Sequence, residues 1–186
     1  MIIKVLEESE FESFFNDLMP KAFADRFAYS IMQVRTEREL QNFKELKDAF
    51  SGRESYYLGA YTDDGKLMGW SASYQGKVYE LYTKNSVVLP EYRRMGVYSE
   101  LTRAVLKHAE ERGFQMVCSH HNASNNSVII AKMKLGFYIT GCEVSDDFGT
   151  LVKMTKYLNP AREKAFHVRT GHERPDLEMK ELLRIT

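Results

Sequence analysis

The stretch Leu89-Pro-Glu-Tyr-Arg-Arg-Met-Gly-Val-Tyr-Ser-Glu-Leu101 joins a short apolar run to an amphipathic segment. This order predicts a strand, a tight loop and a helix that begins just after Gly96. A helix N-terminus presents unpaired backbone N–H groups and partial positive charge, which together suit a phosphate group. Gly96 has no Cβ, so the main chain there can come close to a ligand. With Arg93 and Arg94 beside it, the loop is predicted to be an anion site, most simply for a phosphorylated cofactor.

The elements on either side of this loop form a predicted β-α-β unit. Residues 79–89 are expected to be a strand, residues 97–112 a helix with one apolar face, and residues 114–120 a second strand. The two strands should be parallel, because a helical crossover returns the chain to the same edge of the sheet.

Turn residues and hydrophobic periodicity outline the rest of the chain. Thr36 and Glu39 have the spacing of a capping box, which marks a helix start. Residues 160–186 form a charged tail after a main domain over residues 1–159, and the tail is open to three interpretations: a docked helix, a dimer arm or a partly disordered segment. Further strands are expected over residues 1–6, 56–62, 66–74, 137–144 and 148–157, and further helices over 9–20, 36–50 and 125–135.

The composition limits the possible partners. The chain has 186 residues, 44% hydrophobic and 28% charged, which is ordinary for one globular domain. Lys plus Arg equals Asp plus Glu at 26 each, so no net field attracts nucleic acid or an anionic membrane. Cys118 and Cys142 have neither metal-ligand nor disulfide-framework spacing. We expect a cytoplasmic protein with no metal, no nucleic-acid partner and no membrane span, and a homodimer is possible.

The loop and the order of elements resemble the GNAT superfamily of acyl-CoA-dependent N-acyltransferases. That family has Gln/Arg-x-x-Gly-x-Gly/Ala after its fourth strand, and Arg93-Arg94-Met95-Gly96-Val97-Tyr98 stands here. Asn125-Asn126-Ser127 and Lys134-Leu135-Gly136-Phe137 follow at the family's spacing, so the match covers roughly residues 54–157. The resemblance implies an α/β fold: a central mixed, mostly antiparallel sheet with helices on both faces and a parallel strand pair flanking the CoA-binding loop.

The resemblance also implies acetyl-CoA as cosubstrate. Backbone groups of the fourth strand would pair with the pantetheine arm, the loop would hold the pyrophosphate, and the start of the second helix would add contacts. Tyr98 departs from the family's glycine or alanine, which leaves the backbone there less free to curl. The implied contacts are Ser86, Val87, Val88, Arg93, Arg94, Met95, Gly96, Val97, Tyr98, Ser99, Asn125 and Ser127.

Glu80, Tyr82 and Lys132 are the main candidates for proton transfer, and a histidine is a further one. Many members of the family have a glutamate on the fourth strand that acts as the general base, and by spacing from Gly96 the matching position here is Tyr82. Glu80 lies two residues earlier and therefore on the same face of the strand. Glu80 is the preferred base, with Tyr82 orienting a water. Lys132 stands where many members carry a tyrosine general acid; its ammonium could protonate the thiolate, contact the adenosine phosphates or point to solvent. One of His120 and His121 should face the same side as the candidate base, and an imidazole titrates in the useful range.

The implied reaction is acetyl transfer from acetyl-CoA to a primary amine by direct attack in a ternary complex. The acceptor, a small molecule or a peptide, is not identified by the sequence. The alternative is a non-catalytic acyl-CoA-binding sensor. Nucleotide hydrolysis is disfavoured because the sequence has no Gly-x-x-x-x-Gly-Lys-Ser/Thr motif.

Overall fold

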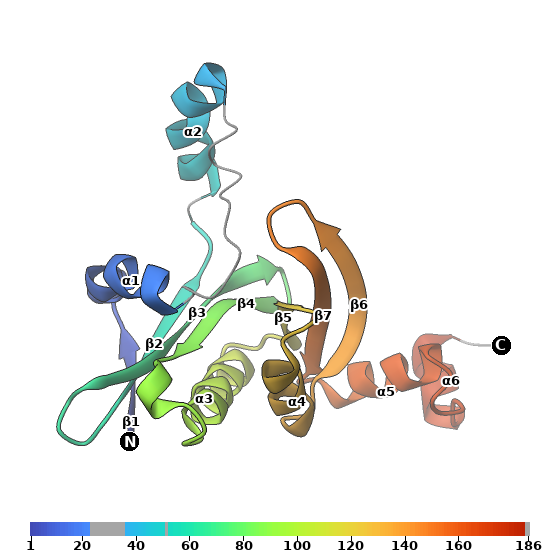
Figure 1. Cartoon of the computed structure of the whole chain (residues 1–186). Helices are drawn as coiled ribbons and strands as arrows, with labels where there is room; N and C mark the ends of the chain where they lie inside the picture. The colour runs from blue at the N-terminus through green and yellow to red at the C-terminus, as the bar shows by residue number, and fades with distance from the viewer. Residues whose placement is uncertain (23–35, 51, 185–186) are drawn as a thin grey trace.

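The computed structural model describes residues 1–22, 36–50 and 52–184, and a mixed sheet of seven strands crosses them in the order β1-β2-β3-β4-β5-β7-β6 (Figure 1). Only β4 and β5 are parallel among the neighbouring pairs of this sheet; the others are antiparallel. The predicted sheet is therefore confirmed. The strands are β1 (Ile2–Leu6), β2 (Ser55–Tyr61), β3 (Leu67–Lys77), β4 (Glu80–Val88), β5 (Met116–Asn122), β6 (Tyr138–Ser145) and β7 (Gly149–Tyr157).

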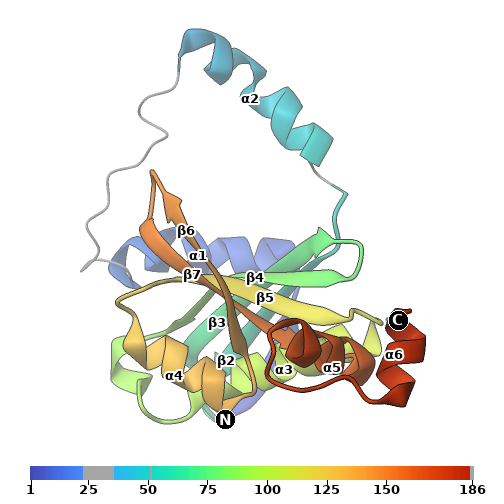
Figure 2. The same ribbon diagram turned by 90° about the vertical axis from the view of Figure 1, so that its right-hand side faces the viewer.

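Helices cover both faces of the sheet. Helices α3 and α4 lie on one face and α1 on the other, while α2 projects away from the sheet in both views (Figures 1 and 2). No helix in the described ranges is long and apolar enough to cross a membrane. The helices are α1 (Glu8–Ala22), α2 (Glu37–Phe50), α3 (Val97–Glu111), α4 (Asn126–Lys134), α5 (Pro160–Arg169) and α6 (Leu177–Leu183), with a 3₁₀ turn at Pro90–Tyr92.

The main core lies between the sheet and α3. Leu101 and Val105, four residues apart on the predicted apolar face, are buried against Leu81 of β4 and Val117 of β5. Burying a Leu or Val side chain contributes about 1.5–3 kcal/mol each, so this face fixes α3 firmly beneath the two parallel strands. The start of α3 is thereby held at the carboxyl end of β4.

A second cluster of buried side chains attaches α1 to the opposite face. The Trp70 indole is fully buried beside the rings of Phe14 and Phe15, and its Nε1–H donates to Asn85 Oδ1 at 3.2 Å. Phe11 of the same helix stacks on Tyr57 at 4.6 Å between ring centroids. An indole N–H needs an acceptor when buried, so Asn85 makes this packing acceptable.

The predicted capping box at the start of α2 is present in full. The Thr36 backbone N–H donates to Glu39 Oε2 at 2.7 Å, and the Glu39 N–H donates to Thr36 Oγ1 at 3.3 Å. Leu40 and Phe43 on this helix are exposed, because α2 stands away from the sheet instead of packing on it.

The described part of the tail, residues 160–184, contains the two helices α5 and α6. Asn159 caps α5 by accepting from the Arg162 N–H at 3.0 Å. The ring of Phe166 then contacts Tyr138 of β6 and Tyr157 of β7 at about the same separation, 5.2 and 5.1 Å between centroids. In the next helix Met179 is buried.

Candidate active site

Strands β4 and β5 are paired only over the first residues of each strand. Their parallel register joins Glu80 to Met116 and continues to Tyr82 and Cys118, where the pairing ends. Residues 83–88 then keep their pairing with β3 alone, which leaves the backbone edge that faces β5 without a strand partner. An exposed strand edge of this kind can pair with any extended chain that carries amide groups.

A bulge marks the point where the opening begins. Ala72 of β3 faces Asn85, but the next residue of β3, Ser73, faces Thr83, so Lys84 has no partner across the strand pair. Such a bulge increases the local twist and turns the strand away from its neighbour.

The side chains of the predicted strand contacts are already engaged in packing. Ser86 Oγ lies 2.8 Å from Ser71 Oγ, Val87 is buried in the cluster beneath α1, and Val88 packs partly on the main core. The backbone edge of these residues that faces β5 is not paired, so it is the part of the strand on which the predicted main-chain contacts to a cofactor depend.

The loop before α3 is shaped by two left-handed residues. Gly96 has φ +82°, and Arg94, with φ 63°, takes this uncommon conformation without being glycine. A Cβ built at Gly96 would meet no atom within 4 Å, so open space lies beside the backbone there. No side chain caps α3 at Gly96, and the first-turn N–H groups of Val97, Tyr98 and Ser99 are therefore not used by a capping side chain. Arg93, Arg94 and Met95 are exposed around them.

Tyr98 ends in a buried hydroxyl group that lacks a hydrogen-bond partner among the described residues. Burial raises the pKa of this phenol, so it is an un-ionised donor and acceptor. An unpaired buried hydroxyl costs about 1–3 kcal/mol. The uncapped first turn of α3 and the open space beside Gly96 fit a phosphorylated cofactor.

The start of α4 is capped by the side chain of Asn125. Asn125 Oδ1 accepts from the Val128 N–H at 3.5 Å and from Ser127 Oγ at 3.1 Å. Asn125 and Ser127 therefore hold each other in place, and the carbonyl of Asn125 is used by the cap. Its amide N–H groups are the part that a cofactor would meet.

Lys132 is buried in the structure, at 1% exposure. Its Nζ lies 4.0 Å from the centroid of the Phe137 ring, a cation–π contact. Burial lowers the pKa of this ammonium to about 7, and the neighbouring Cys118 offsets only part of the effect. The solvent-facing alternative is therefore wrong, and the group can both give and take a proton near neutral pH.

A hydrogen-bonded pair occupies the point where β4 and β5 diverge. His120 Nδ1 lies 3.1 Å from Tyr82 Oη, and His120 Nε2 lies 3.6 Å from Glu143 Oε2 of the β6–β7 hairpin. Burial raises the pKa of Tyr82 to about 12. His121 points to the other face and lies 2.8 Å from Ser119 Oγ, so His120 is the histidine that shares a face with Tyr82. Glu143 was not predicted, because only the folded hairpin brings it to β5.

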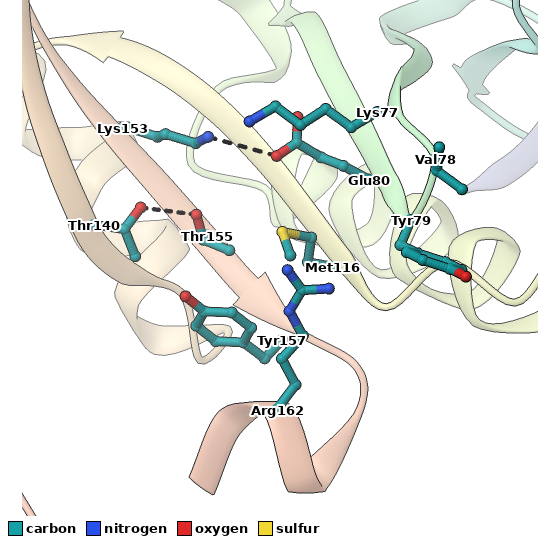
Figure 3. Close-up of a pocket in the computed structure, with 10 residues that line it drawn as sticks. All are labelled: Lys77, Val78, Tyr79, Glu80, Met116, Thr140, Lys153, Thr155, Tyr157 and Arg162. Carbon is teal, nitrogen blue, oxygen red and sulfur yellow. Dashed lines mark hydrogen bonds and ion pairs between the residues drawn. The ribbon is translucent and has the colours of Figure 1, made fainter. Parts of the chain in front are cut away.

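Glu80 lies in a cavity on the same face, two residues before Tyr82 (Figure 3). It is 6% exposed, and its Oε2 lies 3.5 Å from Lys153 Nζ. A Cβ at Gly76 would come within 2.8 Å of Glu80 Oε1, so glycine allows β3 to pass close to this carboxylate. The cavity has a volume of ≈ 420 Å³ and is lined by Lys77, Val78, Tyr79, Glu80, Met116, Thr140, Lys153, Thr155, Tyr157 and Arg162.

The charge of this cavity is mainly positive. The charged groups that line it are three cations, Lys77, Lys153 and Arg162, and one carboxylate, that of Glu80. Arg162 comes from α5, where its Nη1 donates to Gln115 Oε1 at 2.5 Å, so a neutral amide holds the guanidinium. The tail, to which the sequence assigned no role, therefore supplies one wall of the cavity.

Comparisons with known proteins agree with this arrangement. Residues 9–137 match the acetyltransferase (GNAT) family. The structure of yncA from Salmonella typhimurium, solved with its cofactor acetyl-CoA, aligns with a TM-score of 0.63 at 14% identity, covering 95% of this chain and 98% of that one. The structure of ribosomal-protein-alanine N-acetyltransferase from Brucella melitensis aligns with a TM-score of 0.62 at 18% identity, covering 85% of this chain and 100% of that one. The structure of nourseothricin acetyltransferase aligns with a TM-score of 0.52 at 26% identity, covering 56% of this chain and 66% of that one. A search of curated protein sequences found no match.

Proposed function

Given that the chain belongs to the acetyltransferase (GNAT) family, whose cosubstrate is acetyl-CoA, we propose that it transfers the acetyl group directly to a primary amine in a ternary complex. The observation that carries this proposal is the unpaired edge of residues 83–88 next to the uncapped start of α3. An extended pantetheine arm supplies amides for that edge, and a pyrophosphate suits the helix start. A main-chain N–H of the same edge polarises the thioester carbonyl.

Hydrogen–deuterium exchange tests where the cosubstrate binds. Acetyl-CoA is expected to slow amide exchange within residues 83–88 and at residues 97–99, because those N–H groups gain acceptors. Protection confined to other segments would contradict the proposed binding mode.

Direct attack is favoured over an acyl-enzyme by the state of Cys118, the cysteine beside Glu80. Its side chain is fully buried, and burial together with Glu80 raises the pKa of the thiol to about 12. A thiol rather than a thiolate is present at neutral pH, so this cysteine is a poor nucleophile. In the proposed mechanism the amine nitrogen forms the new C–N bond itself as the C–S bond of the thioester breaks.

The proton balance needs a base for the amine and an acid for the departing thiolate. We assign the first role to His120, because it lies at the divergence of the strands, whereas Glu80 is held by Lys153 within the cavity. Tyr82 orients the imidazole, and Glu80 becomes part of acceptor binding. Lys132 as an ammonium gives its proton to the sulfur as the C–S bond breaks.

Two variants separate the candidate bases. His120→Gln should lower kcat by about 10²–10⁴-fold with little change in KM, while Glu80→Gln should mainly raise KM for the acceptor. The opposite pattern would return the role of base to Glu80.

The cavity beside Glu80 gives the acceptor a chemical class. Its excess of cations suits an acceptor whose amine end reaches the strand divergence while a carboxylate or phosphate contacts Lys77 and Arg162. Arg162→Gln should therefore raise KM for such an acceptor roughly tenfold. Arg169→Gln, an exposed arginine on the same helix, is the matched control and should leave KM unchanged. Equal KM values for both variants would remove Arg162 from the acceptor site.

A further inference from the structure

The end of α5 and the turn after it gather His167, His172 and Glu173. One potential ligand atom from each lies within 4.8 Å of the others. Gly171, with φ +74°, ends helix α5. In the turn that follows, the backbone N–H groups of His172 and Glu173 both donate to the His167 carbonyl oxygen, at 2.9 and 3.2 Å. The backbone of this turn therefore folds both side chains back towards His167.

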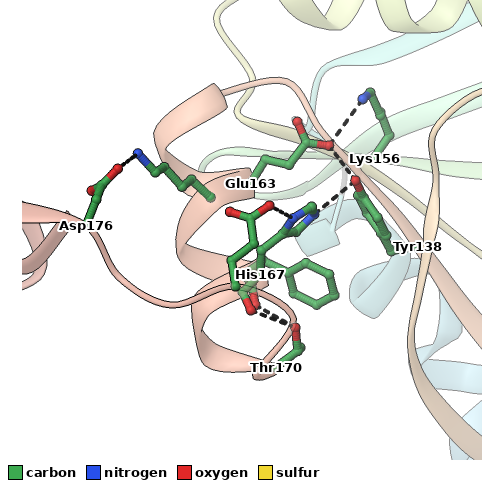
Figure 4. A network of polar contacts seen from close by, with 9 residues as sticks. Tyr138, Lys156, Glu163, His167, Thr170 and Asp176 are labelled. Carbon is green, nitrogen blue, oxygen red and sulfur yellow. Dashed lines mark hydrogen bonds and ion pairs between the residues drawn. The ribbon is translucent and has the colours of Figure 1, made fainter. Parts of the chain in front are cut away.

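The proton on the His167 ring is placed by a chain of hydrogen bonds (Figure 4). Glu163 lies 3.5 Å from the Lys156 ammonium, and its carboxylate can only accept, so the Tyr138 hydroxyl donates to it at 3.0 Å. The Tyr138 oxygen must then accept from His167 Nε2, which lies 3.0 Å away. In a neutral imidazole the proton is therefore on Nε2, and Nδ1 carries a lone pair.

That lone pair faces another acceptor. His167 Nδ1 lies 3.0 Å from Glu173 Oε1, so two electron-rich atoms meet at hydrogen-bond distance. The ring of His172 stands perpendicular to that of His167, with centroids 5.1 Å apart. A cation shared by the three groups satisfies all of them at once.

We propose that His167, His172 and Glu173 bind a divalent transition metal ion of the zinc type. Two imidazoles and one carboxylate suit Zn²⁺, whereas Mg²⁺ and Ca²⁺ prefer more oxygen ligands. The Nε2–H donated to Tyr138 is the outer hydrogen bond that metal-bound histidines usually make. The ion joins the turn after α5 to β6 through Tyr138, and so clamps the helix that carries Arg162.

The test uses the full-length, untagged protein after treatment with a chelator. Titration with Zn²⁺ against a chromophoric chelator should show one saturable site, and Zn²⁺ should raise the melting temperature while Mg²⁺ at the same concentration does not. His172→Ala and Glu173→Gln should each weaken Zn²⁺ binding at least tenfold. Glu178→Gln, which changes another exposed carboxylate of the tail, should bind as the wild type does.

Tyr138 is a positioning residue in this proposal. Tyr138→Phe should weaken Zn²⁺ binding about 10–100-fold, and ¹⁵N NMR of the His167 ring should report the Nε2–H tautomer in wild type and a mixture in the variant. Absence of saturable binding, or equal affinity in wild type, His172→Ala and Glu173→Gln, would overturn the site. A doubly protonated His167 ring that Zn²⁺ leaves unchanged at neutral pH would overturn it too, because the contact with Glu173 is then an ion pair.

Discussion

Burying an ammonium is costly unless its charge is compensated, and Lys132 lies inside the protein with its ammonium against the ring of Phe137. The family tyrosine that it replaces has a neutral hydroxyl of high pKa. In the proposed mechanism, a lysine whose pKa is lowered to about 7 would perform the same task over a lower pH range. The proposed acid would then be kept and its working pH range changed.

Substituting Lys132 tests this role. Lys132→Met should lower kcat by about 10²–10⁴-fold, because no group remains to protonate the thiolate. Lys132→Tyr should keep most of the activity and move the basic limb of the pH–rate profile upward, since a phenol loses its proton later than this ammonium. The measurement is the release of free thiol from acetyl-CoA across pH 6–10. A Lys132→Met enzyme with wild-type kcat would eliminate Lys132 as the acid.

At the scale of elements, α3 shows which features a sequence can predict. Its start at Gly96, its apolar face and its closure at Gly113 all follow from local chemistry, and the structure has each of them. The parallel pairing of β4 with β5 follows from the crossover in the same way. Local pattern decides these features, because glycine conformations and a 3.6-residue period depend on the chain itself.

Other elements depend on distant contacts and could not be predicted from pattern. The burial of Lys132 depends on how α4 sits on the sheet, and Glu143 reaches His120 only through the β6–β7 hairpin. The docking of the tail depends on aromatic contacts between Phe166 and two strands. A polar residue in a periodic pattern predicts solvent by default, and tertiary packing overrides that default here.

The two glycines at the ends of α3 form a matched pair. Gly96 and Gly113 have φ +82° and +84°, and a Cβ at either would meet no atom within 4 Å. Alanine at each should cost a similar stability, about 1–2 kcal/mol, through the left-handed backbone. Only Gly96→Ala should also weaken CoA binding, because its Cβ stands where the ligand approaches. Calorimetric titration with CoA checks this, and equal affinities for the two variants would show that Gly96 serves the turn alone.

At the scale of the whole molecule, Lys132 links protonation to stability. Its pKa is about 7 in the folded protein against 10.5 for the free side chain, so between these values the unfolded chain binds more protons. Stability must then rise with pH across that range, by up to about 1.4 kcal/mol per pH unit from this group. Below pH 7 the destabilisation is present in full.

Chemical denaturation between pH 7 and 9 measures this slope. This window avoids the higher range, where Cys118, with its raised pKa, acts in the opposite direction. Lys132→Met should be more stable than the wild type at pH 7, and the difference should shrink as the pH rises. A constant difference across the window would mean that the lysine has an ordinary pKa.

In the proposed mechanism, an amine with an anionic end would lie between the cavity at Glu80 and the point where β4 and β5 separate. The most direct measurement is free-thiol release from acetyl-CoA with primary amines in matched pairs, each carboxylate beside its uncharged amide. We expect turnover with at least one amine and a higher kcat/KM for the carboxylate member of its pair. Thermal stabilisation by CoA without thiol release on any amine, or a consistent preference for the uncharged members, would contradict this account.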